Sequence, residues 1–213
     1  MTTPIDYKTT TRESYNEHAK QFAVFAKGFR GKLEEWIESF VKEVKNGDQI
    51  LDVGCGAGRD AQFFIKQGLH VTGIDNSEKL IEITKDKVPG GAFFVMDFEE
   101  LPLPKNSFEG IWANASLVHL PKENILPVLK RLGTVLKPGG VFFSTWRVGK
   151  GEKFTVEKRG KAELKRYYAY YQPEELASLL QKAGFTDITN DFDEIESGKW
   201  ILMIAHKSDA ENA

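Results

Sequence analysis

Three glycines stand at every second position of the segment Asp52-Val53-Gly54-Cys55-Gly56-Ala57-Gly58. Glycine has no Cβ, so such a segment can turn tightly and lie directly against a ligand. A buried strand is predicted before it at Gln49–Val53, and a helix after it at Arg59–Gln67. Ligands of open α/β sheets bind at the carboxyl ends of the strands, so this glycine loop is a candidate binding site.

An acidic residue closes the next predicted strand. Asp75 follows the strand Leu69–Ile74 and stands 17 residues after Gly58. A carboxylate at that place can accept hydrogen bonds from both hydroxyls of a ribose, and Asn76 beside it belongs to the same expected site. Either feature alone could be structural, the loop a simple turn and Asp75 a cap for the next helix. In this order along the chain they indicate a nucleoside site.

The glycine spacing and the nearby charge distinguish between nucleosides. The dinucleotide fingerprint is G-x-G-x-x-G, whereas here Arg59 stands where the last glycine would fall and Gly58 comes one residue early. Asp52 directly precedes the loop, and its carboxylate would repel a pyrophosphate but attract an ammonium group. S-adenosylmethionine carries an amino acid and a sulfonium and has no phosphate. The local charge therefore favours S-adenosylmethionine over NAD.

These residues resemble a known family. Leu51–Gly58 looks like motif I of the class I S-adenosylmethionine-dependent methyltransferases, and Asp75 matches the acidic residue of their second strand. Asp97-Phe98 resembles their adenine site, where the acid accepts from the adenine amino group and the next backbone N–H meets a ring nitrogen. Leu136–Gly140 resembles the turn before their fifth strand. The resemblance implies a donor site formed by Asp52, Gly54, Cys55, Gly56, Gly58, Arg59, Asp75, Asn76, Asp97, Phe98 and Asn114.

The resemblance covers roughly residues 35 to 206 and is strongest with one branch. The segment around Gly56, Arg59 and Asp60 is most like the small-molecule branch, which includes quinone-biosynthesis-type and tellurite-resistance-type methyltransferases. The first helix, with Tyr15 and Ala19, resembles the N-terminal lid of that branch. In the branch an arginine at the position of Arg59 can reach the cofactor's carboxylate. A salt bridge with Asp60 is the alternative.

The elements that must position these residues alternate between β-branched runs and helical stretches, which predicts a parallel sheet covered by helices. Further strands are expected at 92–96, 108–113 and 141–146, with helices at 14–25, 32–44, 77–87, 122–136 and 173–183. Two final strands, 186–195 and 199–206, are joined by a turn too short for a parallel connection. We therefore expect a Rossmann-like three-layer α/β/α sandwich, with a seven-stranded, mostly parallel sheet and an antiparallel C-terminal hairpin.

The acceptor side carries weaker signals. The fourth strand runs into Trp112–His119, an edge that faces donor and acceptor in the family, so Asn114 and Ser116 are candidate contacts. His119 is the candidate general base because its ordinary pKa lies near working pH. The alternative is that His119 only braces the loop and helix at Leu120-Pro121.

Residues 147–172 interrupt the order of elements and form a charged segment, read either as a solvated face or as a substrate-side insertion. Our hypothesis is that Trp146, Arg147 and part of the cluster Tyr167–Tyr171 line an acceptor pocket. Tyr15, from the N-terminal helical lid at residues 1–46, would close this pocket from above.

Composition bounds the remaining possibilities. The chain of 213 residues is 41% hydrophobic, which suits a single domain, 1–213, with a real core. A net charge of −2 argues against a general nucleic-acid binder. Neither a secretory signal nor a membrane span is visible, and Cys55 is the only cysteine, so no intrachain disulfide can form. We expect a cytoplasmic monomer or homodimer with no metal site.

The leading hypothesis is thus a methyltransferase that acts on a small molecule by in-line displacement, and three rivals remain. A nicotinamide-dependent reductase is disfavoured by the glycine spacing, Asp52 and the final hairpin. A non-catalytic S-adenosylmethionine-binding domain stays open, because the acceptor side has no diagnostic motif. A nucleic-acid or protein methyltransferase is disfavoured because Asn114–Leu117 replaces the acceptor-loop motif of many such enzymes.

Overall fold

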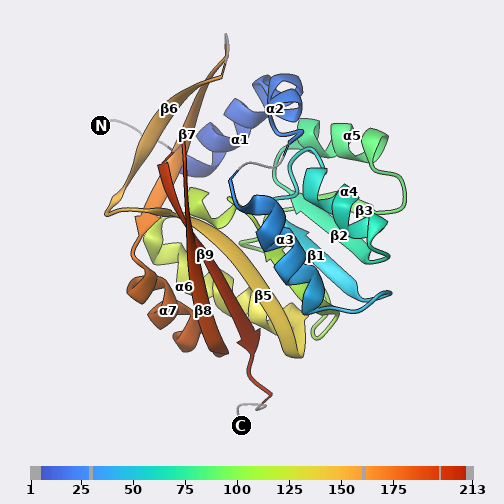
Figure 1. Cartoon of the computed structure of the whole chain (residues 1–213). Helices are drawn as coiled ribbons and strands as arrows, with labels where there is room; N and C mark the ends of the chain where they lie inside the picture. The colour runs from blue at the N-terminus through green and yellow to red at the C-terminus, as the bar shows by residue number, and fades with distance from the viewer. Residues whose placement is uncertain (1–5, 29–30, 160–161, 197, 210–213) are drawn as a thin grey trace.

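Five parallel strands form the centre of the sheet, as predicted (Figure 1). The computed structural model describes residues 6–28, 31–159, 162–196 and 198–209. The parallel strands lie in the order β3, β2, β1, β4, β5. Their bounds are β1 Gln49–Val53, β2 His70–Asp75, β3 Ala92–Val95, β4 Phe108–Ala113 and β5 Leu136–Val148. The chain moves outward from β1 in both directions, so β1 and β4 lie where the strand order reverses.

The predicted C-terminal hairpin extends the sheet beyond β5. Strand β9 (Gly198–Lys207) pairs antiparallel with β5, and β8 (Phe185–Ile195) pairs antiparallel with β9. Residue 197, in the expected turn of the hairpin, lies outside the described residues. The hairpin confirms the seven strands expected from the sequence.

The segment 147–172 adds two further strands, so the described residues form nine. Strands β6 (Glu152–Arg159) and β7 (Ala162–Tyr171) pair with each other antiparallel, and the end of β7 pairs with the end of β5. The reason lies in a two-residue alternation: Ala162, Leu164, Arg166 and Tyr168 are buried, while Glu163 and Lys165 are exposed. Successive strand residues point to opposite faces, so this charged segment has one face that packs inward.

Helices cover both faces of the sheet and so make three layers. Buried side chains of α3, α4 and α5 pack on one face, and those of α6 and α7 on the other. The bounds are α3 Leu33–Lys42, α4 Arg59–Lys66, α5 Glu78–Lys87, η1 Leu117–His119, α6 Lys122–Val135 and α7 Pro173–Lys182. None of the described helices is long and apolar enough to cross a membrane.

Side chains of the central strands alternate between these two cores. Trp112 and Phe143 stack on the α3 side with ring centroids 3.7 Å apart, and Phe40 and Phe64 pack around them. Each fully buried side chain of this size stabilises the fold by about 1.5–3 kcal/mol. These cores fix the ends of β1, β2 and β4, where the candidate site residues stand.

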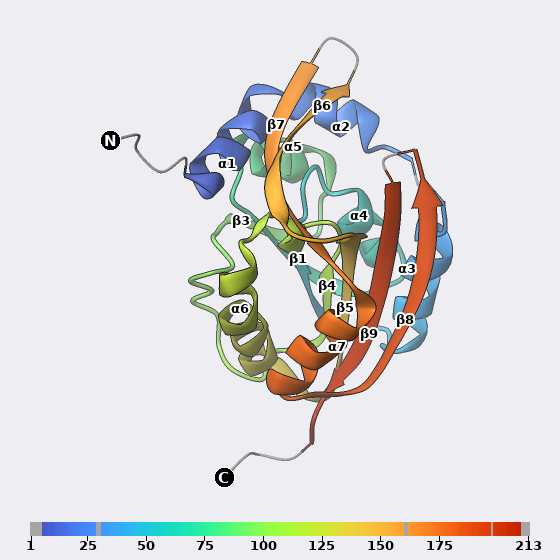
Figure 2. The ribbon, with the colours of Figure 1, turned by 90° about the vertical axis from the view of Figure 1, so that its left-hand side faces the viewer.

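The N-terminal helices lie at the carboxyl ends of the parallel strands. Figure 2 shows α1 (Tyr7–Glu17) and α2 (Ala19–Phe25) above the sheet, with α1 packed against β7. The expected helix start at Ser14 is wrong: α1 begins at Tyr7, because Asp6 accepts a hydrogen bond from the backbone N–H of Lys8 and caps it there. Ser14 lies buried inside this helix.

Candidate active site

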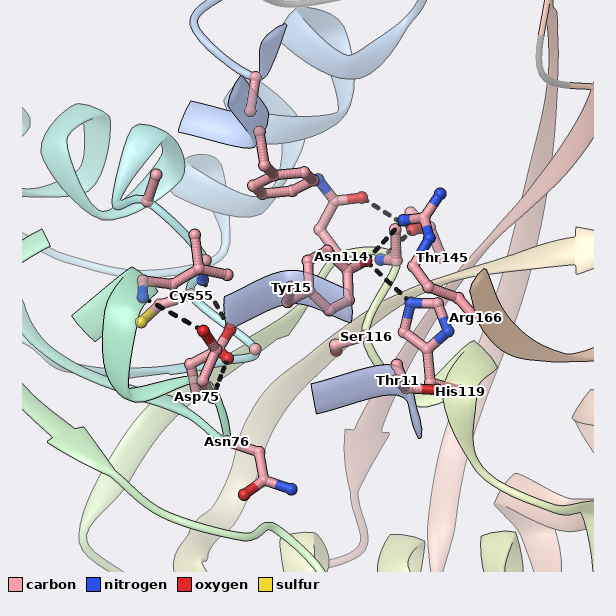
Figure 3. A pocket seen from close by; sticks show the side chains of 18 of the residues that line it. Thr11, Tyr15, Cys55, Asp75, Asn76, Asn114, Ser116, His119, Thr145 and Arg166 are labelled. Carbon is pink, nitrogen blue, oxygen red and sulfur yellow. Dashed lines mark hydrogen bonds between the residues drawn. The ribbon is translucent and has the colours of Figure 1, made fainter. Parts of the chain in front are cut away.

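A cavity of about 280 Å³ lies between the strand ends and the N-terminal helices (Figure 3). The glycine loop, Asp75 and the loop after β3 line one part, and α1, α2, η1 and β7 line the other. Twelve of the sequence-predicted site residues line it: Tyr15, Gly54, Cys55, Gly56, Arg59, Asp75, Asn76, Asp97, Phe98, Asn114, Ser116 and His119. The fold therefore brings segments distant in sequence to one cavity.

The glycine loop has no room for other residues at two of its positions. A Cβ on Gly54 would lie 2.3 Å from Ser116 Cβ, and one on Gly58 would lie 2.7 Å from Thr84 Cγ2. Both glycines also have positive φ, 73° and 80°. The loop can therefore lie close to η1 and α5 only with glycine at these places. Gly58 does not line the cavity and acts by shaping the loop.

Asp75 holds the loop from the end of β2. Its carboxylate accepts hydrogen bonds from the backbone N–H of Gly56 at 3.0 Å and of Ser77 at 2.8 Å. Burial raises the pKa of Asp75 to about 6, although these two hydrogen bonds favour the ionised form. A carboxylate has room for about four hydrogen bonds, so Asp75 keeps acceptor capacity toward the cavity.

Asp97 is bound to the N-terminal helix. Lys8 Nζ lies 2.6 Å from both Asp97 Oδ2 and Glu99 Oε2. Tyr7 donates its hydroxyl to Glu99 at 2.8 Å. Lys8, Asp97, Phe98 and Glu99 all line the cavity, so α1 is attached directly over the segment that the sequence assigned to adenine.

A buried network lies between the glycine loop and β4. Arg59 donates to Asp60 at 2.5 Å and 2.9 Å, so the salt bridge expected as the alternative for Arg59 is present. Asp60 also accepts 3.0 Å hydrogen bonds from Trp112 Nε1 and Asn114 Nδ2. Burial disfavours the ionised form, but Arg59 and these donors hold the pKa of Asp60 below its ordinary value. Arg59 still lines the cavity.

Of two neighbouring residues predicted for the donor site, Cys55 lines the cavity and Asp52 does not. Asp52 is buried beneath the loop and does not line the cavity, and its Oδ2 has no hydrogen-bond partner among the described residues. Burial and the nearby Asp60 raise the pKa of Asp52 well above its usual range. Burial likewise raises the pKa of the Cys55 thiol, so Cys55 is a small loop residue with an inert side chain.

Tyr15 and His119 meet at the other part of the cavity, together with Arg166 (Figure 3). Arg166 donates from Nη1 to the Tyr15 hydroxyl at 2.7 Å, and this hydroxyl lies 3.1 Å from His119 Nε2. His119 Nδ1 lies 2.6 Å from the carbonyl oxygen of Tyr167. Burial lowers the pKa of His119 to about 3, and the charge of Arg166 adds to this, so the ring is neutral.

Two residues expected on the acceptor side do not line the cavity. Trp146 is fully buried in the core, packs on Tyr171 and donates to Ser144 Oγ at 2.8 Å. The expectation for Trp146 is wrong by one residue, because neighbours on a strand face opposite sides and Thr145 is the one that lines the cavity.

Arg147 contacts residues that line the cavity. It does not line the cavity itself, and its guanidinium covers the rings of Trp200 and Tyr168, which do. Arg147 therefore supports two lining rings without reaching the space between them.

The sequence missed several lining residues. The largest omissions are Arg166 on β7 and the aromatic residues Phe22, Trp36, Tyr168 and Trp200, although Tyr168 lies within the predicted tyrosine cluster. The alternation along residues 162–168 could have shown that Arg166 shares a face with Leu164 and Tyr168. Nothing local indicates that Trp36 or Trp200 lines the cavity. Trp200 is brought there by the pairing of β9 with β5, and Trp36 on α3 donates a hydrogen bond to Asp191 of β8.

Comparisons with known proteins agree with this arrangement. A methyltransferase-domain profile matches residues 50–140. Methyltransferase GfsG of Streptomyces halstedii is 34% identical over 105 residues, which are 46% of this chain, and the match spans only 37% of that relative. Demethylmenaquinone methyltransferase of Symbiobacterium thermophilum is 26% identical over 86% of this chain and 88% of its own length.

A solved structure shows the same fold over nearly the whole chain. It is that of the 1,6-didemethyltoxoflavin-N1-methyltransferase of Burkholderia thailandensis, bound to 1,6-didemethyltoxoflavin and S-adenosylhomocysteine. The TM-score is 0.75 at 21% identity, and the match covers 98% of this chain and 92% of that one. Residues 50–140 thus carry the family's sequence pattern and the whole chain has its architecture. The comparisons thus support a class I S-adenosylmethionine-dependent methyltransferase, with the family's sequence pattern shown over residues 50–140.

Proposed function

We propose that this chain transfers the methyl group of S-adenosylmethionine to a small-molecule acceptor. The position of Asp75 carries the proposal: a half-buried carboxylate that lines the cavity at the end of β2, opposite a glycine loop whose backbone it holds. A nucleoside with two free ribose hydroxyls fits such a carboxylate. Two of the similar proteins described above are named for methylation of small molecules, which supports the same reading.

The donor half of the cavity suits S-adenosylmethionine better than a dinucleotide. The carboxylates of Asp60, Asp75, Asp97 and Glu99 line this half. This negative charge favours a ligand with an ammonium and a sulfonium and disfavours a pyrophosphate. Asp75 would hold the ribose and Asp97 the adenine, with Arg59 close enough to the loop to meet the carboxylate.

The chain's own residues have a limited task in the reaction. When bound, S-adenosylmethionine supplies a methyl group already activated by the sulfonium, so the protein must mainly hold the acceptor in line with it. Tyr15, Ser116 and His119 line the acceptor half. With a pKa of about 3, His119 is a weak base, and its Nε2 is bonded to Tyr15. We therefore assign His119 a positioning role: it fixes the Tyr15 hydroxyl beside the acceptor.

The test is conversion of methyl-labelled S-adenosylmethionine by the full chain with a panel of small hydroxyl, amine, thiol and carbon acceptors. The proposal predicts label transfer that is lost in Asp75→Ala and kept in Asp86→Ala, a matched change of an exposed carboxylate on α5. Binding of S-adenosylhomocysteine without turnover across the panel would favour the non-catalytic domain instead.

A further inference from the structure

Arg166 is a buried cation with one nitrogen, Nε, that has no hydrogen-bond partner among the described residues. Its side chain is 3% exposed, yet it lines the acceptor half of the cavity. Nη1 donates to Tyr15 and Nη2 donates to Glu157 at 2.5 Å. Nε itself is buried. Leaving a buried charged donor unpaired is costly, which indicates that a partner comes from outside the chain.

The guanidinium cannot easily turn to find a partner within the protein. Its central carbon lies 5.2 Å from the centre of the Tyr15 ring and 5.3 Å from that of Tyr168. The two hydrogen bonds to Tyr15 and Glu157 fix its remaining freedom. His119, which also contacts the Tyr15 hydroxyl, already uses both of its ring nitrogens. The unpaired Nε–H of Arg166 is therefore fixed in orientation, on a residue that lines the cavity.

The charge around the cavity selects the kind of oxygen. Six acidic and four basic side chains line it among the described residues, so the lining is negative overall. Glu157 already compensates Arg166 through their ion pair. A carboxylate or phosphate on the acceptor would add like charge to this lining. A neutral carbonyl or hydroxyl oxygen would accept the hydrogen bond without that cost.

The shape of the lining selects the rest of the ligand. Aromatic side chains from α1, α2, α3, β7 and β9 line much of the cavity: Tyr15, Phe22, Phe25, Trp36, Tyr168 and Trp200. Flat rings pack well against such side chains. Resting on the proposed function, we propose that Arg166 Nε binds a neutral oxygen on an aromatic or conjugated ring of the acceptor, and so selects acceptors of that class.

Three fluorescent or ultraviolet-absorbing probes of one shape test this selection: naphthalene, 1-naphthol and 1-naphthoate. They are titrated at neutral pH into the full chain saturated with S-adenosylhomocysteine. We expect 1-naphthol to bind about tenfold more tightly than naphthalene, as one hydrogen bond to a charged donor allows. We expect 1-naphthoate to bind more weakly than 1-naphthol, because its charge meets an acidic lining.

Variants assign the preference to Arg166. Arg166→Met should remove the advantage of 1-naphthol, and Arg166→Lys should do so while keeping a cation beside Glu157 if the methionine variant folds poorly. Lys165→Met is the matched control, because Lys165 is exposed on the other face of β7. Glu157→Gln should improve 1-naphthoate binding relative to wild type, since it removes the compensating charge.

Two results would overturn the inference: equal or undetectable binding of the three probes by wild type, or a 1-naphthol preference that survives in Arg166→Lys. Affinity for S-adenosylhomocysteine separates this failure from failure of the proposed function. If the nucleoside binds and the preference is absent, only the assignment of Arg166 is lost. If the nucleoside does not bind, the proposed function fails first.

Discussion

The hydroxyl of Tyr15 donates its hydrogen to Nε2 of His119, 3.1 Å away. The direction follows from the neighbours. Arg166 can only donate, so the Tyr15 oxygen accepts from it and must use its own hydrogen elsewhere. The carbonyl of Tyr167 can only accept, so His119 carries its proton on Nδ1. Four residues from α1, η1 and β7 thus form one directed chain of hydrogen bonds.

Removing the Tyr15 hydroxyl should break this chain on both sides. In Tyr15→Phe, Arg166 Nη1 and His119 Nε2 each lose a buried partner, and the free energy of unfolding should fall by about 1–3 kcal/mol. Urea denaturation measures this. Tyr170→Phe, where the hydroxyl makes one long contact with Thr155, is the control and should change little. An unchanged stability in Tyr15→Phe would show that the chain of hydrogen bonds contributes nothing.

His119 should make the protein sensitive to acid. Its folded pKa of about 3 lies below the ordinary 6.5, so the unfolded chain binds the proton more readily and stability is lost as pH falls below 6.5. Between pH 7.5 and pH 5 this loss should be about 2 kcal/mol. In His119→Gln that component should be absent, so the variant's stability should change less over the same range. Parallel curves of unfolding free energy against pH for the two proteins would contradict the neutral state of His119.

Asp75 predicts a pH dependence in ligand binding. Its pKa of about 6 is raised by burial, so the carboxylate that would hold the ribose becomes protonated as pH falls through that value. Affinity for S-adenosylhomocysteine should be constant above pH 7 and about tenfold weaker at pH 5. Asp75→Asn cannot titrate and should bind more weakly at every pH with no step near pH 6. A step that persists in this variant would place the titrating group elsewhere.

Trp146 should matter for stability and leave binding unaltered. Trp146→Ala removes a fully buried ring and should cost about 3–5 kcal/mol of unfolding free energy. Trp146→Phe keeps most of the ring, so it suits the functional comparison, and should leave affinities for S-adenosylhomocysteine and for an acceptor unchanged. A weakened acceptor affinity in this variant, with stability intact, would restore the role that the sequence suggested.

The donor side could be predicted from the sequence because its information is local. The glycine spacing, Asp75 at a strand end and Asp97 after the next strand need only the order of elements to meet at one edge. The structure explains the glycine at position 54, because Ser116 leaves no space for a Cβ there. The order of strands and the final hairpin could likewise be predicted, from the alternation of β-branched runs with helical stretches and from the short turn between the last two strands.

The acceptor side could not be predicted as well, because it depends on register and on distant pairing. On β5 the residue that faces the cavity is Thr145, whereas the sequence predicted its neighbour Trp146, because adjacent strand residues point to opposite faces. Arg166 reaches the site only because β7 pairs with both β6 and β5 and packs against α1. The N-terminal helix begins at Tyr7 through a cap by Asp6, so Lys8 and Tyr7 reach Asp97 and Glu99 where no motif indicated it.

The most direct measurement is calorimetric titration of S-adenosylhomocysteine and, separately, NADH into wild type, Asp75→Ala and the control Asp86→Ala. We expect wild type and Asp86→Ala to bind S-adenosylhomocysteine equally and not to bind NADH. We expect Asp75→Ala to lose about 1–3 kcal/mol of binding free energy. Binding of NADH in place of S-adenosylhomocysteine, or an affinity indifferent to Asp75, would contradict the proposed function.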